Sequence, residues 1–173
     1  ISDVSFGRKP NGANTWNYFG ESTPKTSNNT NATLNTLISK APQISVASGI
    51  YSGTQTVSIN PADSTEFRYT LDGSLPKSSS AKYETPLTIS STTTLRVRAF
   101  EGNKLPSKIV TKSYIIDEPN NLPILSITAF PETLFGREIG IYTNEIKSRE
   151  APVNVQLFEK DGNMAFEVDA GIR

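Results

Sequence analysis

The 173-residue sequence contains no cysteine and no histidine. Without cysteine the chain has no disulfide, no thiolate nucleophile and no cysteine-type zinc site. Without histidine it lacks the commonest general base and the commonest zinc ligand. These absences narrow the chemistry open to the chain, and we predict that it holds neither a metal nor a cofactor.

Neither sign of charge is in excess, because 17 basic residues balance 17 acidic ones. Proteins that bind nucleic acids usually carry a basic excess that replaces the counterions around the phosphates. The sequence also has no apolar run approaching the roughly 20 residues that span a bilayer. We therefore predict no nucleic-acid partner and no membrane span in this chain.

Two signatures of enzymes are also missing. Glycoside hydrolysis needs two carboxyl groups held across a cleft, whereas the acidic residues of the central region are scattered over loops and outward positions. Neither G-x-x-x-x-G-K-[ST] nor G-x-G-x-x-G, which hold phosphates, occurs in the sequence. We predict that the chain is not an enzyme and has no catalytic residue.

What the sequence does contain is a repeated alternation of apolar and polar residues between positions 42 and 117. In residues 66–71, Phe67, Tyr69 and Leu71 share one face. A period of two is typical of a β-strand with one buried face. The same pattern predicts further strands at 55–59, 87–89, 94–99 and 108–116.

About six or seven short strands in roughly 75 residues predict an immunoglobulin-like antiparallel β-sandwich. The whole chain is predicted to be all-β, with an additional β-rich segment at its C-terminal end. Alternation places Arg68, Arg96 and Arg98 on the outer face of the sandwich. We expect them to be ordinary charges on a solvated strand face, and a binding patch is the less favoured alternative.

Residues 123–173 carry a second set of strand signals. Asp161 and Gly162 stand between two alternating runs, which is a strong hairpin signal. Because that hairpin runs to the last residue and the first residue is Ile, we interpret the chain as a fragment of a longer protein. The predicted strands of this segment lie at 124–128, 140–142, 153–157 and 164–172.

One candidate ion site deserves comparison with its structural alternative. Asp72 and Ser74 flank Gly73 in an arrangement that resembles part of a calcium loop. Calcium needs about 6–8 oxygen ligands, and this spacing supplies only two side chains. Aspartate before glycine favours an Asx turn, which we predict here.

Three aromatic residues are candidates for ligand binding. Tyr51, Tyr83 and Trp16 would stack against sugar rings if they were exposed, because aromatic faces bind apolar C–H groups. Tyr69 is in register with the core residues of its strand and is expected to be buried. Burial in a core is the more frequent role of such rings.

The first piece of the chain, residues 1–27, resembles the end of a bacterial lamin-tail domain. The resemblance rests on GRKPNG at 7–12, Trp16 and the Thr-Pro pair at 23–24. It departs from the family at Asn11 and Lys25, where Asp and Gly are usual. The resemblance implies that only the last part of that domain is present, so its own sandwich cannot form.

The middle piece resembles the chitobiase/β-hexosaminidase C-terminal-like module, an immunoglobulin-like accessory domain. The motifs are SGIYSG at 48–53, RYTLDGSLP at 68–76 and TLRVRA at 94–99, together with Tyr83 and Pro86. The resemblance covers nearly all of the predicted sandwich.

The last piece resembles the start of the CotH region of spore-coat kinases. The motifs are LPILSI at 122–127, GIY at 140–142, VNVQLF at 153–158 and DAGIR at 169–173. In that family the nucleotide-binding and catalytic residues lie farther downstream, so the resemblance transfers none of them to this chain.

These features predict five segments and one principal function. We expect a non-catalytic structural, spacer or interaction module of a secreted or cell-surface bacterial protein, whose intact parent is a CotH-like kinase. Its partners would be neighbouring domains of the same chain, or a surface glycan or protein. The alternative is a carbohydrate-binding accessory module. The segments are 1–27 (lamin-tail remnant), 28–41 (linker), 42–117 (sandwich), 118–122 (linker) and 123–173 (CotH-like start).

Overall fold

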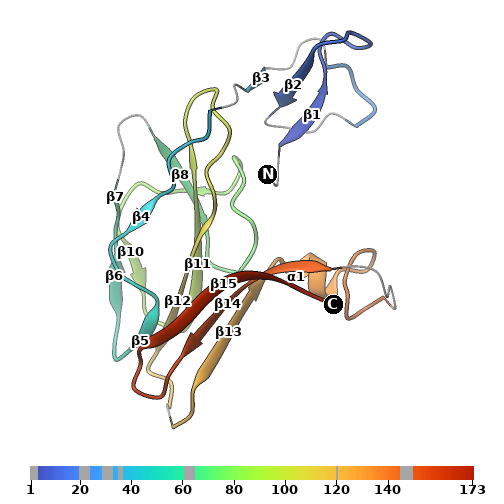
Figure 1. Cartoon of the computed structure of the whole chain (residues 1–173). Coiled ribbons are helices and arrows are strands. Elements are labelled where there is room, and N and C mark those ends of the chain that lie inside the picture. The colour runs from blue at the N-terminus through green and yellow to red at the C-terminus, as the bar shows by residue number, and fades with distance from the viewer. Residues whose placement is uncertain are drawn as a thin grey trace.

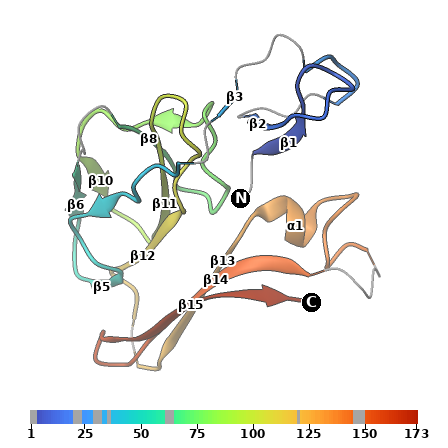
Figure 2. The ribbon, with the colours of Figure 1, turned by 45° about the horizontal axis from the view of Figure 1, so that its top comes forward.

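The computed structural model describes residues 4–19, 24–28, 33–34, 37–60, 65–119, 121–144 and 150–173. Strands dominate these ranges, which confirms the predicted all-β class. A small N-terminal sheet lies at one end of a central sandwich, and a C-terminal sheet lies beside it (Figures 1 and 2). Within the described ranges, no helix combines the length and the apolar character needed to cross a bilayer.

The N-terminal sheet is antiparallel and has three strands, β1 (Ser5–Arg8), β2 (Trp16–Phe19) and β3 (Thr33–Leu34). Strands β1 and β2 form a hairpin in which Ser5 pairs with Phe19. Phe19 is buried, with 1% of its surface exposed.

The central sandwich has two layers. One layer is a five-stranded sheet in the order β5 (Gly49–Tyr51), β12 (Val110–Ile116), β11 (Thr93–Phe100), β8 (Glu66–Thr70) and β9 (Ala81–Lys82). The opposite layer consists of two strand pairs, β4 (Gln43–Ile44) with β7 (Ile59–Asn60) and β6 (Gln55–Val57) with β10 (Leu87–Ile89). All pairs are antiparallel except β5 with β12, which is parallel.

The core of the sandwich contains the apolar residues that alternation placed inward. Phe67 and Val97 are buried, as predicted, at 4% and 0% exposure. Leu71 is not, because β8 ends at Thr70 and the leucine side chain is 44% exposed. Burying an aliphatic or phenylalanine side chain contributes roughly 1.5–3 kcal/mol each. The buried cluster consists of Val57, Ile59, Phe67, Ile89, Leu95, Val97, Ala99, Tyr114 and Ile116.

The C-terminal sheet has the order β13 (Ile124–Ala129), β14 (Ala151–Phe158) and β15 (Met164–Ile172), all antiparallel. The predicted hairpin between β14 and β15 is confirmed, and Gly162 takes a positive φ of 86° at its turn. The Asp161 carboxylate accepts a hydrogen bond of 3.0 Å from the Asn163 backbone.

The strand predicted at residues 140–142 is wrong. A five-residue helix, α1 (Pro131–Phe135), follows β13, and the sequence signals did not predict it. The backbone N–H groups of Ile141 and Tyr142 donate to the carbonyls of Thr133 and Leu134 in that helix, at 3.0 and 2.9 Å. The segment therefore folds back as a turn because its donors are used by the helix and not by a neighbouring strand.

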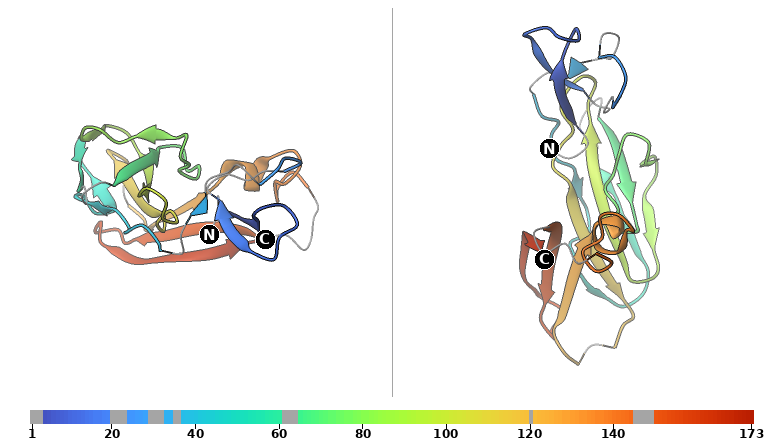
Figure 3. Two further views of the ribbon diagram at one scale, coloured as in Figure 1. Left: turned by 90° about the horizontal axis from the view of Figure 1, so that it is seen from above. Right: turned by 90° about the vertical axis from the view of Figure 1, so that its right-hand side faces the viewer.

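The C-terminal sheet forms a separate layer alongside the sandwich (Figure 3). It turns its polar face towards the outer face of the five-stranded sheet, where Gln156 bonds to the Thr111 carbonyl. Its apolar face points away, and Ile127, Phe166 and Val168 on that face are 49%, 45% and 47% exposed. The central strand β14 thus buries Asn154 and Gln156 against the sandwich, whereas β15 is exposed along nearly all of its length.

Candidate functional site

Tyr51 lies on β5 at one edge of the five-stranded sheet and packs partly buried against the core. Its hydroxyl donates to the Ala47 carbonyl at 2.8 Å, and its ring centroid lies 6.2 Å from that of Tyr114. Burial raises the pKa of the Tyr51 phenol. The Tyr51 ring therefore packs at the edge of the hydrophobic core.

Tyr83 follows β9, at the opposite edge of the same sheet from Tyr51. Its hydroxyl accepts a hydrogen bond of 3.1 Å from the Ile59 backbone, and its own backbone N–H donates to Phe67 at 2.9 Å. It is half-buried against the core. Three strands separate β5 from β9, so the structure does not bring the two tyrosines together.

Trp16 lies on β2 in the N-terminal sheet and is 52% exposed. Its ring stacks on Phe6, with centroids 5.2 Å apart and planes inclined by 23°. The Arg8 guanidinium lies 5.3 Å from the Trp16 ring centroid, within range of a cation–π interaction. Of the three predicted aromatics, Trp16 is the most exposed, although Phe6 and Arg8 lie against its ring.

The prediction that Arg96 and Arg98 face solvent is wrong, because they are only 9% and 2% exposed. Alternation placed them correctly on the outer face of β11, but the C-terminal sheet covers that face. Arg68, on the same face of β8, is half-buried and forms an ion pair of 2.6 Å with Glu66.

Polar side chains join the two sheets across this covered face. The Ser113 and Ser126 hydroxyls lie 2.9 Å apart, and Gln156 Nε2 donates to the Thr111 carbonyl at 3.4 Å. Gln156 is fully buried, and the same Nε2 also reaches Asn154 at 3.1 Å. A buried polar interface of this kind favours one relative arrangement, because each displaced donor or acceptor would lose its partner.

Arg96 is the charged group at the centre of this interface. Its Nη1 donates to the Gly73 carbonyl at 2.8 Å, while its Nε is buried without a hydrogen-bond partner. Among the described residues, no carboxylate lies within ion-pair distance of it. Burial lowers the pKa of Arg96, and the more distant charge of Asp169 opposes that shift.

The Asp72–Gly73–Ser74 segment is the Asx turn that the sequence predicts. The Asp72 carboxylate accepts from the Ser74 hydroxyl at 2.6 Å and from the Ser74 backbone at 3.0 Å. These hydrogen bonds lower the pKa of Asp72. In the part of the chain that the structure describes, no group of three or more acidic side chains is arranged to hold a metal ion.

The same turn contacts the C-terminal sheet. Gly73 has a φ of 79°, and a side-chain Cβ at this position would lie 3.1 Å from the Ala129 carbonyl oxygen. Glycine therefore meets two requirements here, the left-handed backbone and the close approach of β13.

A cavity of about 600 Å³ lies between the sandwich and the C-terminal sheet. Arg96 and Arg98 line it from β11, and Asn154 and Asp169 line it from β14 and β15. Most of the remaining wall is apolar, which is the usual composition of a ligand site. The sequence did not predict this cavity, because nothing in the alternation indicates which outer faces meet.

Comparison with known families identifies the middle of the chain. Residues 46–111 match the chitobiase/beta-hexosaminidase C-terminal domain. No curated protein and no solved structure matches the chain. The resemblance of the middle piece is thereby confirmed, while the lamin-tail and CotH resemblances of the flanking pieces stay predictions.

The matched range covers one side of the interface between the two sheets. Gly73, Arg96 and Arg98 lie within the matched residues 46–111, whereas Asn154 and Gln156 lie beyond them. The cavity is therefore lined by residues of the matched range and by residues on both sides of it, Ile38 before it and Asn154 after it.

Proposed function

We propose that this chain is a non-catalytic structural module whose sandwich holds the following sheet in a fixed orientation. The observation that carries the proposal is the buried polar contact between Thr111 and Gln156. An apolar contact would tolerate sliding, whereas buried hydrogen bonds depend on direction and distance.

The energetic argument rests on burial. Leaving one buried donor or acceptor without a partner costs about 1–3 kcal/mol. Rotating the sheet away from the sandwich would separate Ser113 from Ser126 and Gln156 from Thr111, which are 2.9 and 3.4 Å apart. Water would replace these partners only if it entered the whole interface. Several such contacts together favour one orientation.

We further propose the wider context from the resemblances stated above. The parent would be a secreted or cell-surface bacterial protein with a lamin-tail domain before the sandwich and a CotH-like kinase region after it. This chain would then position the kinase region and carry no catalytic residue itself. Motifs 7–12 and 169–173 support this context.

Backbone ¹⁵N relaxation of the full 173-residue chain tests the structural proposal. We expect one rotational correlation time for residues 42–117 and 123–173, and a scattering profile that fits the arrangement in Figure 1. Two clearly different correlation times would overturn the proposal, because a module that fixes orientation cannot tumble independently.

A pair of glutamine substitutions makes the test specific. Gln156→Ala removes a side chain that is buried at the interface, whereas Gln55→Ala removes one whose hydrogen bond, among the described residues, goes to nearby Gly53 at 3.1 Å. We expect Gln156→Ala to increase the relative motion of the two sheets and Gln55→Ala to leave it unchanged. Equal effects of the two variants would contradict the proposed role of the interface.

A second candidate function is carbohydrate binding, and the exposed Phe6–Trp16 stack favours it. These two aromatic residues are 55% and 52% exposed, and their uncovered surface would offer apolar contact to a sugar. Calorimetric titration with chitin and cell-wall oligosaccharides would give binding that Trp16→Ala abolishes and Tyr83→Phe retains. No binding at millimolar oligosaccharide would rule this function out.

A further inference from the structure

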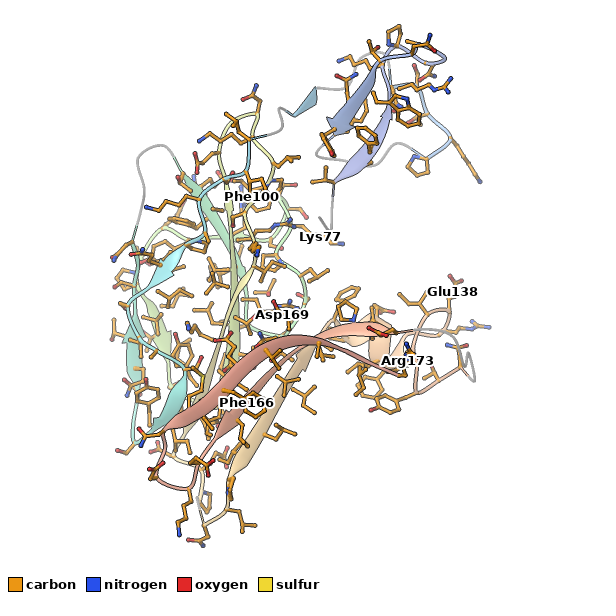
Figure 4. The ribbon with its side chains drawn as sticks, viewed as in Figure 1. Lys77, Phe100, Glu138, Phe166, Asp169 and Arg173 are labelled. Carbon is orange, nitrogen blue, oxygen red and sulfur yellow. The ribbon has the colours of Figure 1, made fainter. Side chains whose placement is uncertain are left out.

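The cavity between the sandwich and the C-terminal sheet has a distinctive charge. Its lining holds three cationic side chains and one carboxylate, a net charge of +2, from Arg96, Arg98, Lys108 and Asp169. Asp169 lies on the side of β15 that faces the sandwich, whereas Phe166 lies nearer the end of β15 at the hairpin turn (Figure 4). An excess of positive charge in a recess favours an anionic occupant.

Arg96 is a cationic group of this cavity that has no carboxylate within ion-pair distance among the described residues. It is 91% buried, since 9% of its surface is exposed, and the Gly73 carbonyl is its one hydrogen-bond acceptor among the described residues. A neutral carbonyl satisfies a donor but does not neutralise the charge. A buried charge without an opposite partner is costly, and pairing with a carboxylate offsets that cost.

Asp169 does not supply this partner. Its carboxylate accepts a hydrogen bond of 2.9 Å from Asn154 Nδ2, which holds it on the C-terminal wall. It forms no ion pair with Arg96 within the usual distance, although it lines the same cavity. Asp169 would repel an incoming anion and so limits how tightly one binds.

The apolar part of the wall restricts the body of the ligand. Ile109 and Phe130 line the cavity together with Pro152. A small inorganic anion would leave these groups without contacts, whereas an organic acid with an apolar body would cover them. The volume of about 600 Å³ admits a molecule of that size.

We propose that this cavity binds a small organic carboxylate with an apolar body, whose carboxylate compensates the charge of Arg96. The site requires both sheets, so the inference rests on the fixed orientation proposed above. It differs from the carbohydrate site considered for Trp16, which lies in the N-terminal sheet.

The test is titration of the full ¹⁵N-labelled chain with 3-phenylpropionate and, in parallel, with its uncharged amide. We expect the carboxylate to shift the backbone resonances of Thr111, Val153 and Ala170, which line the cavity. The amide should bind about tenfold more weakly or worse, because it lacks the charge. Glucuronate, a carboxylate with a hydroxylated body, should also bind more weakly than 3-phenylpropionate.

Two substitutions in the cavity should change the affinity for 3-phenylpropionate in opposite directions. Arg96→Gln should weaken 3-phenylpropionate about tenfold, and Asp169→Asn should tighten it by removing the competing charge. Arg8→Gln, in the N-terminal sheet, is the matched control and should have no effect. If Arg96→Gln fails to fold, the comparison of acid with amide and the Asp169→Asn variant still decide the question.

Three outcomes would overturn the inference: equal binding of acid and amide, shifts confined to residues outside the cavity, or no binding at millimolar acid. The relaxation data on the same sample separate this failure from failure of the proposed function. One correlation time without acid binding refutes the ligand site alone, whereas two correlation times refute the fixed orientation on which the site depends.

Discussion

The Arg96 guanidinium donates a hydrogen bond of 2.8 Å to the carbonyl of Gly73, and both residues lie under the C-terminal sheet. This bond ties the middle of β11 to the turn that follows β8. Gly73 in that turn lies close to the Ala129 carbonyl of β13. One short path therefore connects a buried charge, a turn and the neighbouring sheet, and changes along it should affect stability and orientation together.

Gly73→Ala should destabilise the protein more than Gly53→Ala. Both glycines have positive φ, 79° and 75°, and such strain costs of order 1–3 kcal/mol for other residues. A Cβ at Gly73 would also lie 3.1 Å from the Ala129 oxygen, whereas nothing lies within 4 Å of one at Gly53. Urea unfolding of the two variants measures the difference, and equal losses would mean that β13 does not approach the turn.

Tyr114→Phe should lower the free energy of unfolding by about 1–2 kcal/mol, because the fully buried hydroxyl donates to the Val46 carbonyl at 3.0 Å. Burial raises the pKa of Tyr114 above its ordinary range, so the phenol stays protonated in the fold. Tyr51→Phe is the control, since water can replace its more exposed bond to Ala47, and it should cost less than about 0.5 kcal/mol. A larger loss for Tyr51→Phe would contradict its position at the edge of the core.

Asp72 should make the stability depend on acid pH. Its folded pKa is lowered by hydrogen bonds from Ser74, so its contribution is complete above the unfolded pKa of about 3.9 and is lost as the pH falls through the folded pKa. Asp72→Asn keeps an acceptor for Ser74 but does not titrate. Urea unfolding from pH 5 downwards should therefore show a shallower loss of stability in Asp72→Asn than in the wild type, and identical slopes would show that Asp72 is not involved.

Val168→Thr should be tolerated, although the same change at Val97 should not. Val97 is fully buried in the core, where an added hydroxyl without a partner costs about 1–3 kcal/mol. Val168 is 47% exposed on the open face of β15, where water can hydrate the hydroxyl, and the loss should stay within about 0.5 kcal/mol. Thermal or urea unfolding compares them, and a similar loss at both positions would mean that the apolar face of β15 is covered.

Several elements could be predicted from the sequence because their signals are local. Alternation in residues 66–71 and 94–99 predicted β8 and β11, and Asp161–Gly162 predicted the β14–β15 hairpin. The Asx turn at Asp72 was also predictable, since its hydrogen bonds join residues only two positions apart. In each case the covalent chain itself brings the interacting groups together.

Other features could not be predicted because their causes lie far away in the sequence. The Ile141 backbone bonds to Thr133 of α1, which removed the strand predicted at 140–142. Tyr51 and Tyr83 looked equally accessible as sequence, but the order of strands put them at opposite edges of one sheet. Of the three candidates, Trp16 in the separate N-terminal sheet is the most exposed.

The sequence by itself determined which side chains share a face, because successive residues of a strand point to opposite sides. It thereby put Arg96 and Arg98 on the outer face of β11, opposite Leu95 and Val97. Only the tertiary structure decided that a second sheet would cover that face with its own polar side, burying both arginines. The physical reason is that a period of two distinguishes the two faces of a strand but carries no information about what each face will meet.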